Sequence, residues 1–240
     1  DFHVRQLYYP YRLWRNKVSK PIRLVFSVYS NMIYRLFEYR FNKLEDYSSI
    51  ELIRTKNYSL QDMHISLEDL MDIRRNTVVT KSDNISETVI PFIQADSVNR
   101  LISLLENMES NPMTAEQIIE LMDFVGRQYN YYVSAGIYLG IFERELENKT
   151  TKLTEIGVSL CRMTYKERQL KLVSLMVEHR IFADFFDYVI DNNGELPSKQ
   201  QVCNKMRELN VCRSESTMER RACSVLSWLK WIFNLPHLAE

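Results

Sequence analysis

The stretch TAEQIIELMDFVGRQYNYYVSAGIYLGIFERELENKTTKLTEIG, residues 114–157, decides how the C-terminal part of the chain is interpreted. Thr114 followed three residues later by Gln117 is a capping-box signature, which predicts that a helix begins there. A further helix is predicted between Gly126 and Gly140, because glycine commonly follows a helix end. Residues 141–154 are apolar at both ends with a polar turn between them, a pattern typical of a hairpin.

A preceding helix is predicted after Ser97, a residue type that caps helix starts. Apolar residues recur at helical spacing along it: Leu101, Ile102, Leu104, Leu105 and Met108. Three helices and a hairpin with short connections predict a winged helix-turn-helix over residues 96–158. Such a fold serves either DNA binding or protein interaction, so it does not settle the function.

The N-terminal part has a different period. Residues 22–29, 32–41 and 49–55 alternate with a period of two and are rich in β-branched and aromatic side chains, which predicts three strands of one sheet. A short helix is predicted over 4–16, with Pro10 inside it.

These patterns predict an α+β chain of four parts. Residues 1–60 are interpreted as the remainder of an α/β core and 61–95 as an acidic connector with one short helix near 66–73. The winged helix-turn-helix covers 96–158. A second helical domain covers 159–240, with helices expected at 165–180, 181–191, 198–209 and 215–233. No sheet is expected after residue 96 beyond the hairpin near 141–154.

The net charge of zero conceals an asymmetry along the chain. Residues 1–60 hold eleven Lys and Arg against five Asp and Glu, whereas residues 61–125 hold four against twelve. Residues 126–240 are nearly balanced, with sixteen against fourteen. A basic N-terminal module is compatible with an anionic partner.

Several function classes are excluded. All five glycines follow residue 125, so the first half has neither a P-loop nor a dinucleotide fingerprint and lacks the usual residue of tight hairpin turns. No apolar run is long enough to span a membrane. The four cysteines form no CxxC pair, which favours reduced thiols in a cytoplasmic protein. The four histidines do not have the spacing of metal ligands. The chain begins at Asp1 with no targeting signal, and we interpret it as a fragment.

Two clusters are candidate DNA contacts. The predicted third helix opens with Arg127, Gln128, Tyr129 and Asn130, and Arg and Gln suit guanine and adenine edges. Lys149 and Lys152 of the predicted wing suit phosphates. The second cluster surrounds a predicted helix start and comprises Arg213, Ser214, Thr217, Arg220 and Arg221. The alternatives are that the tyrosines of the third helix pack in a core and that the second cluster is a solvated basic turn.

Catalytic motifs are scarce. A metal-dependent nuclease uses carboxylates to hold Mg²⁺ together with a lysine, commonly an Asp followed by Glu-x-Lys on the next strand. The literal Glu147-Asn148-Lys149 falls in the predicted wing turn without a preceding strand Asp. Glu38-Tyr39-Arg40 lies on a predicted strand as a degenerate version, but Arg is a poor substitute for Lys.

The segments DFHVRQLYYPYRLW and RQYNYYVSAGIYLGIFE resemble parts of type II restriction endonucleases with the PD-(D/E)XK nuclease fold. The segments KPIRLVFSVYSN, IYRLFEYRF and SSIELIRTKNYSL resemble later sheet strands of the same proteins. LTEIG resembles the end of their winged-helix segment, and STMERRACSVLSWLKWI resembles their closing helix.

This resemblance implies Mg²⁺-dependent cleavage of double-stranded DNA by a homodimer. It places Arg5, Gln6 and Tyr9 near the nuclease site in supporting roles. The family's metal-binding Asp and Glu-x-Lys have no counterpart here and are expected upstream of Asp1. Two rival functions stay open: a winged-helix DNA-binding regulator, and a defence-system subunit that binds a partner protein through the tyrosine-rich helix.

Overall fold

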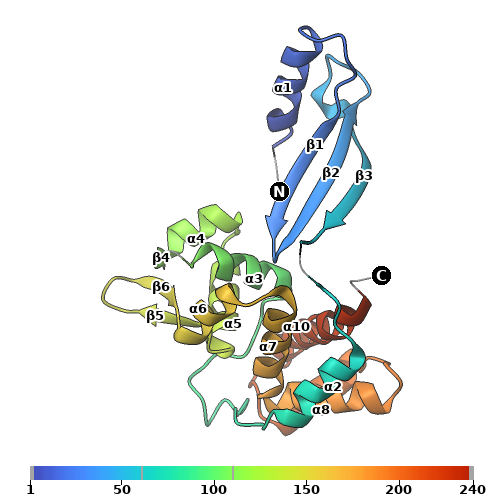
Figure 1. Cartoon of the computed structure of the whole chain (residues 1–240). Helices are drawn as coiled ribbons and strands as arrows, with labels where there is room; N and C mark the ends of the chain where they lie inside the picture. Colours follow the sequence, from blue (N-terminus) through green and yellow to red (C-terminus); the bar gives the residue numbers. More distant parts are fainter. Residues whose placement is uncertain (1–2, 61, 110, 238–240) are drawn as a thin grey trace. The chain divides into compact units, whose positions relative to one another are not determined.

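The chain divides into two compact units, residues 1–61 and 62–240, which are described separately. The structure is a computed structural model and describes residues 3–60, 62–109 and 111–237 (Figure 1). It is a mixed α+β chain, as predicted. Among the described residues, no helix combines the length and the apolar character needed to cross a membrane.

Unit 1 is built on an antiparallel sheet with strand order β1-β2-β3. The strands are β1 (Leu24–Ser30), β2 (Ile33–Phe41) and β3 (Ile50–Tyr58), with a single 3₁₀ turn, η1 (Tyr47–Ser49), before β3. The prediction of three strands in one sheet is confirmed, although β3 runs three residues further than expected.

Helix α1 (Arg5–Arg15) continues through Pro10 and buries its apolar side against the sheet. Its Leu7 and Tyr8 form a small core with Leu24 and Phe41. Tyr8 also donates a hydrogen bond to the carbonyl oxygen of Leu44 at 3.0 Å, which fixes the helix to the β2–β3 connection.

Strands β1 and β2 are joined by a two-residue turn made without glycine. Ser30 pairs with Ile33, so Asn31 and Met32 form the whole loop. Both have positive φ, 51° and 60°, which is the conformation of a type I′ hairpin turn. Asn adopts it readily, whereas Met does so only under constraint.

Unit 2 begins with α2 (Leu67–Asn76) and a segment without helix up to α3 (Val98–Asn107). The predicted connector is not a loose linker, because it contributes the fully buried Ile65, Leu70 and Ile93 to the core of this unit. Ser66 and Asp69 form a capping box that starts α2.

The next elements are β4 (Met113–Thr114), α4 (Ala115–Met122), α5 (Gln128–Tyr138), β5 (Phe142–Glu145) and β6 (Thr150–Leu153). They form a small antiparallel sheet with strand order β4-β6-β5. Our expectation of a hairpin alone was therefore wrong by one strand. Met113 and Thr114 pair with Thr151 and Thr150, and a two-residue strand leaves no periodic signal in the sequence.

The chain ends in a helical array: α6 (Glu155–Arg162), α7 (Tyr165–Val177), α8 (Arg180–Asp191), α9 (Lys199–Glu208), α10 (Glu215–Asn234) and the short η2 (Leu235–His237). Helix α6 was not predicted from the sequence. The buried Trp228 of α10 stacks on Phe182 of α8 and donates to the carbonyl oxygen of Ala95 at 2.9 Å. The array and the preceding segment thus share one core.

Candidate nucleic-acid interface

Helix α5 is held tightly against the small sheet of unit 2. It starts after Gly126, whose φ of +54° allows the sharp entry from α4. A Cβ atom at Gly136 would lie 2.0 Å from Phe142 of β5, so only glycine permits this approach of helix and strand. The position of α5 relative to the β5–β6 hairpin is therefore fixed by packing.

One face of α5 is open to solvent. Arg127 and Asn130 are exposed, and Tyr131 and Ser134 are half-buried on the same side, at the spacing i, i+3, i+4 and i+7. Within the described residues Arg127 has no ion pair or hydrogen bond through its guanidinium. The opposite side is core, which confirms the alternative interpretation for Tyr132 and Tyr138. That interpretation also placed Tyr131 in the core, whereas Tyr131 is only half-buried.

The other two residues predicted at this helix start are Gln128 and Tyr129. The Gln128 side-chain oxygen accepts a hydrogen bond from the Val125 backbone N–H at 2.9 Å and so stabilises the first turn. Tyr129 is half-buried.

Tyr132 lies in the core and donates a hydrogen bond to Asp96 at 2.9 Å. Burial, together with the Asp96 carboxylate, raises the Tyr132 pKa well above its ordinary value.

The β5–β6 hairpin lies against one flank of this face. Arg144 of β5 donates to the side-chain oxygen of Asn130 at 3.4 Å. Lys149 occupies the exposed turn with a φ of 52°.

Lys152 is already paired within the hairpin. Its ammonium lies 3.5 Å from the Glu143 carboxylate and 3.3 Å from that of Glu145. The hydrogen bond and charge of Glu145, with those of Glu143, raise the Lys152 pKa. A phosphate would therefore have to compete with two carboxylates for this cation.

The N-terminal part of α10 lies against the other flank. The Arg220 guanidinium stands 5.8 Å from the centre of the Tyr131 ring and donates to Gln94 at 2.9 Å. Arg213 and Ser214 are exposed at the helix start and Thr217 is half-buried. The contact of Arg220 with Tyr131 thus brings the second predicted cluster beside α5, the helix that carries the first.

Arg221 separates from that cluster and turns inward. Its guanidinium lies 6.0 Å from the centre of the Phe92 ring, and burial lowers the Arg221 pKa. Its Nε atom is buried without a hydrogen-bond partner in the described structure. This geometry withdraws Arg221 from the surface on which Arg220 lies.

In unit 1, the three residues given supporting nuclease roles lie together. Arg5, Gln6 and Tyr9 line a cavity of 640 Å³, whose wall is completed by His3, Val4, Tyr8 and Tyr47. Arg5, Gln6 and Tyr9 are all exposed. The N-terminal turns of α1 thus gather a guanidinium, an amide and a phenol around one opening.

The degenerate motif Glu38-Tyr39-Arg40 is occupied by ion pairs. Glu38 accepts two hydrogen bonds from Arg23, at 2.7 and 2.8 Å, and one from Arg54 at 2.5 Å. The hydrogen bonds from Arg23 and Arg54 lower the Glu38 pKa to about 2. Arg40 pairs with Glu51 at 2.9 Å. Across the part of the chain that the structure describes, no group of three or more His, Cys, Asp or Glu side chains is arranged to hold a metal ion.

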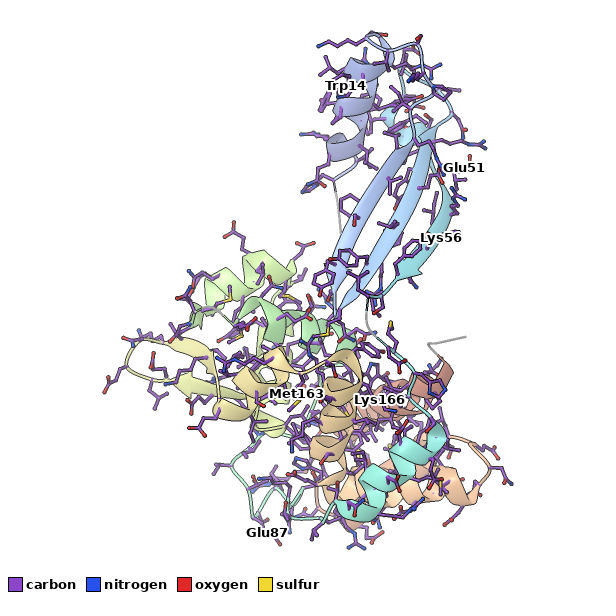
Figure 2. All side chains as sticks on the ribbon, in the orientation of Figure 1. Trp14, Glu51, Lys56, Glu87, Met163 and Lys166 are labelled. Carbon is purple, nitrogen blue, oxygen red and sulfur yellow. The ribbon has the colours of Figure 1, made fainter. Side chains whose placement is uncertain are left out.

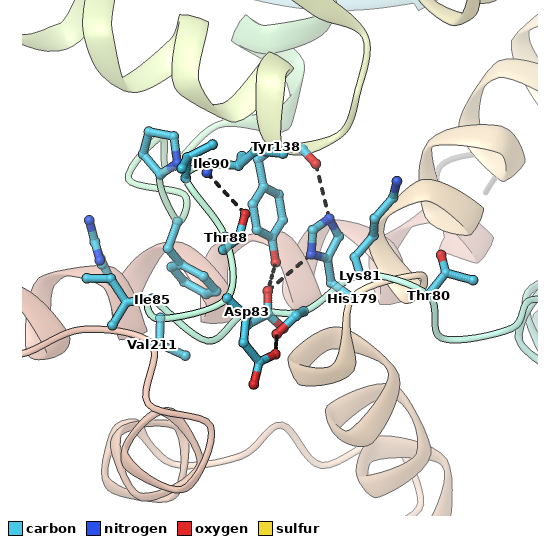
Figure 3. A pocket seen from close by; sticks show the side chains of 15 residues that line it. Thr80, Lys81, Asp83, Ile85, Thr88, Ile90, Tyr138, His179 and Val211 are labelled. Carbon is cyan, nitrogen blue, oxygen red and sulfur yellow. Dashed lines mark hydrogen bonds and ion pairs between the residues drawn. The ribbon is translucent and has the colours of Figure 1, made fainter.

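A buried polar cluster of Asp83, Tyr138 and His179 was not predicted from the sequence (Figure 3). Tyr138 donates to Asp83 Oδ1 at 2.6 Å, and His179 Nδ1 lies 3.1 Å from the same oxygen. Asp83 Oδ2 accepts the Ile181 backbone N–H at 3.1 Å. His179 Nε2 lies 3.0 Å from the Tyr138 carbonyl oxygen. Burial, followed by the Asp83 charge, raises the Tyr138 pKa.

This cluster borders a cavity of 400 Å³ that is also lined by Lys81, Thr88 and Arg221. Each polar atom of the Asp83 carboxylate and of the His179 ring is hydrogen-bonded inside the protein. The cluster therefore acts as a structural tie between the 77–96 segment, α5 and α8, rather than as a set of free catalytic groups. Its members are far apart in the sequence, and no local sequence pattern predicts their contact.

Comparison with known families agrees with the division into two units. A family model described as Domain of unknown function (DUF7226) matches residues 100–237, and the chain belongs to this family. A second, described as Domain of unknown function (DUF6997), matches residues 1–59. Searches of curated proteins and of solved structures found no match.

Proposed function

We propose that residues 97–154 form a winged helix that binds double-stranded DNA, with α5 as the recognition helix. The observation that carries this proposal is the order α3, β4, α4, α5, β5, β6 with the sheet order β4-β6-β5. In this arrangement α4 and α5 form a helix-turn-helix and β5–β6 forms the wing. The second helix of such a motif enters the major groove and the first crosses the backbone.

The base contacts are assigned to the open face of α5. Arg127 is suited to the O6 and N7 acceptors of guanine, and Asn130 to N6 and N7 of adenine. Both side chains are exposed at the N-terminal end of the helix, the end that contacts base edges in helix-turn-helix proteins. Gln128, which stabilises the helix start, supports this geometry indirectly.

The phosphate contacts are assigned to cations on the two flanks. Arg144 and Lys149 lie on the wing, and Arg213 and Arg220 lie at the start of α10. Ser214 and Thr217 add hydroxyl groups at the same helix start, where backbone N–H groups favour an anion. Unit 2 as a whole carries more acidic than basic residues, so DNA would be drawn to this local cluster rather than to the unit at large.

Measured affinity for a selected binding site and for random duplex tests the proposal. The site is first obtained by selection from a random duplex library. Arg127→Ala should weaken binding to that site by about 1–3 kcal/mol and binding to random duplex much less, since a base contact is lost. Arg180→Ala, an exposed arginine on α8, is the matched control. Failure to select any site, or equal losses for both variants, would refute the role of α5.

The cavity at α1 favours a more specific function, that of a type II restriction endonuclease. Arg5, Gln6 and Tyr9 line this cavity, and the resemblance of RQLYYPYR to these nucleases implies supporting roles for them at the nuclease site. The described residues offer no metal cluster, so we assign no catalytic step to Mg²⁺ on this chain. Mg²⁺, a homodimer and a cytoplasmic location are parts of this proposal.

A cleavage assay separates the nuclease from a DNA-binding regulator or a non-catalytic defence subunit. A protein that carries the Asp and Glu-x-Lys of the type II restriction endonucleases before this chain should cleave duplex DNA in the presence of Mg²⁺, and EDTA should abolish the cleavage. In that protein Gln6→Ala should lower the cleavage rate more than the DNA affinity. Cleavage by the 240-residue chain alone, abolished by Glu38→Gln, would place the active site on β2 instead.

A further inference from the structure

Three tyrosines form a row across the sheet of unit 1. Tyr29 of β1 pairs directly with Tyr34 of β2, and Tyr34 pairs with Tyr58 of β3. Directly paired residues project from the same face of a sheet, so the three side chains are neighbours. The ring centres of Tyr29 and Tyr34 are 4.6 Å apart.

The row lies on the face that α1 does not cover. Helix α1 packs on the alternate residues Leu24, Phe26 and Phe41, which project from the other face. The exposed fractions of Tyr29, Tyr34 and Tyr58 are 58 %, 39 % and 50 %. Exposed aromatic rings at three successive strands form a hydrophobic surface that a solvated sheet face does not require for folding.

The same face is positively charged. In the row beside the tyrosines, Lys56 of β3, labelled in Figure 2, pairs with Leu36 of β2. The Lys56 ammonium forms no ion pair within the described residues. In the next row Glu38 is held between Arg23 and Arg54. The cations Arg23, Arg40, Arg54 and Lys56 thus outnumber the anions Glu38 and Glu51 on this face. Unit 1 as a whole has eleven basic and five acidic residues.

We propose that this tyrosine row binds the unpaired bases of a single-stranded nucleic acid. Aromatic rings on an open sheet face stack with bases whatever their sequence, and basic side chains beside them bind the phosphates. In a duplex the bases are already stacked on one another, so this site differs from the duplex surface proposed for α5. Adjacent strands lie about 4.8 Å apart, so the row is long enough for two or three bases.

Fluorescence anisotropy of labelled single-stranded oligonucleotides of about eight nucleotides, measured with the full chain, tests the proposal. The chain should bind an oligothymidine and an oligouridine with similar affinity, because base stacking does not depend on the sugar. It should bind an abasic strand of the same length at least about tenfold more weakly, because the phosphates remain and the bases are lost. Lys56→Ala should reduce the salt dependence of binding.

Variants locate the site. Tyr29→Thr and Tyr58→Thr keep a residue that favours strands and remove the ring, so each should weaken binding about tenfold. Tyr34→Phe retains the ring and should bind as the wild type does. Trp14→Ala removes an aromatic side chain of α1 that is 53 % exposed but lies outside the row, and should leave binding unchanged. Circular dichroism confirms that each variant is folded.

Two results would overturn the proposal. One is equal binding of the abasic and thymidine strands, or equal losses for Tyr29→Thr and Trp14→Ala. The other is protection of the row from tyrosine nitration in the free chain, which would show that another part of the protein covers this face. Arg127→Ala should not change single-strand binding, so failure here is distinguishable from failure of the duplex proposal.

Discussion

The imidazole of His179 stacks on the phenol of Tyr138 with ring centres 3.6 Å apart, and both side chains bond to the same oxygen of Asp83. The three residues come from the 77–96 segment, α5 and the start of α8. A backbone bridge between Lys81 and His179 adds to this connection. The segment that looks like a connector in the sequence is therefore fixed to the helix that we propose to read DNA.

Removing the carboxylate should destabilise unit 2 strongly. Asp83→Ala leaves the Tyr138 hydroxyl, the His179 ring and the Ile181 N–H without their buried acceptor. We expect a loss of about 3–5 kcal/mol in the free energy of unfolding, measured by urea denaturation. Glu87→Ala, an exposed carboxylate of the same segment, should cost less than about 1 kcal/mol. Equal losses for the two variants would show that the buried cluster contributes no more to the free energy of unfolding than an exposed carboxylate does.

The contact between α5 and β5 should not tolerate a methyl group. Gly136→Ala places a Cβ against the Phe142 ring, which is itself buried, and should destabilise the fold by about 1–3 kcal/mol. Ser134→Ala, on the open side of the same helix, should change stability by less than about 0.5 kcal/mol. Thermal unfolding followed by circular dichroism gives both values, and a stable Gly136→Ala variant would mean that the helix is not held so closely.

Arg144 and Lys152 of the wing should differ in their effect on DNA binding. Arg144→Ala should weaken binding to all duplex sequences and reduce the salt dependence by about one phosphate contact. Lys152→Ala should have a smaller effect, because its ammonium is paired with Glu143 and Glu145. Affinities at several salt concentrations measure both. A larger loss for Lys152→Ala would show that DNA displaces those carboxylates.

Acid should weaken the contact between α2 and α7. Partial burial acts to raise the pKa of Asp69 on α2. Hydrogen bonds from Lys166 of α7 and from Ser66 outweigh this effect and lower the Asp69 pKa to about 2, against an ordinary value of 3.8. A lowered pKa in the folded state means that the ionised Asp69 stabilises the fold above pH 4 and loses this contribution as the pH falls towards 2. The stability difference between the wild type and Asp69→Asn should therefore shrink over this range.

Urea unfolding at a series of pH values measures that difference. Asp72→Asn removes a charge from the same helix without touching the Ser66–Lys166 network and controls for net charge. A difference between the wild type and Asp69→Asn that stays constant from pH 6 to pH 2 would contradict the prediction.

The cysteines should react at very different rates. All four are free thiols, and Cys223 is exposed on α10. Burial, with the charge of Glu109, raises the Cys161 pKa to about 11, so little thiolate is present at pH 8. Iodoacetamide should modify Cys223 first and Cys161 much later, as followed by mass spectrometry of the digested protein. Early modification of Cys161 would indicate local opening of α6.

Periodicity was enough to predict the main elements. The three strands of unit 1 and helices such as α3 and α10 are visible because one face is apolar at the period of the element. Helix α6 was missed because the winged helix-turn-helix was predicted to end at residue 158 and the next helix to begin at residue 165. In the structure Gly157 lies inside the helix, where a Cβ would approach the Ile141 carbonyl oxygen to 2.4 Å. A glycine can mark a close contact as well as a helix end.

The candidate sites were less predictable. Arg127 and Asn130 follow from their place at a helix start, but the capping role of Gln128 and the inward turn of Arg221 depend on neighbours distant in the sequence. Asp83 and His179 are 96 residues apart, and they meet where the 77–96 segment pairs with the start of α8. The tyrosine row depends on strand register, which alternation alone does not determine.

The glycine-free turn between β1 and β2 decides which surface unit 1 presents. Because Asn31 and Met32 alone form the loop, Tyr29 faces Tyr34 across the hairpin. A shift of one residue in this pairing would send every side chain of the shifted strand to the opposite face. An insertion at the turn would thus bring Phe26 of β1 into solvent and direct Tyr29 towards the side of α1. Two backbone angles at the end of the hairpin therefore determine the chemical character of both sides of the sheet.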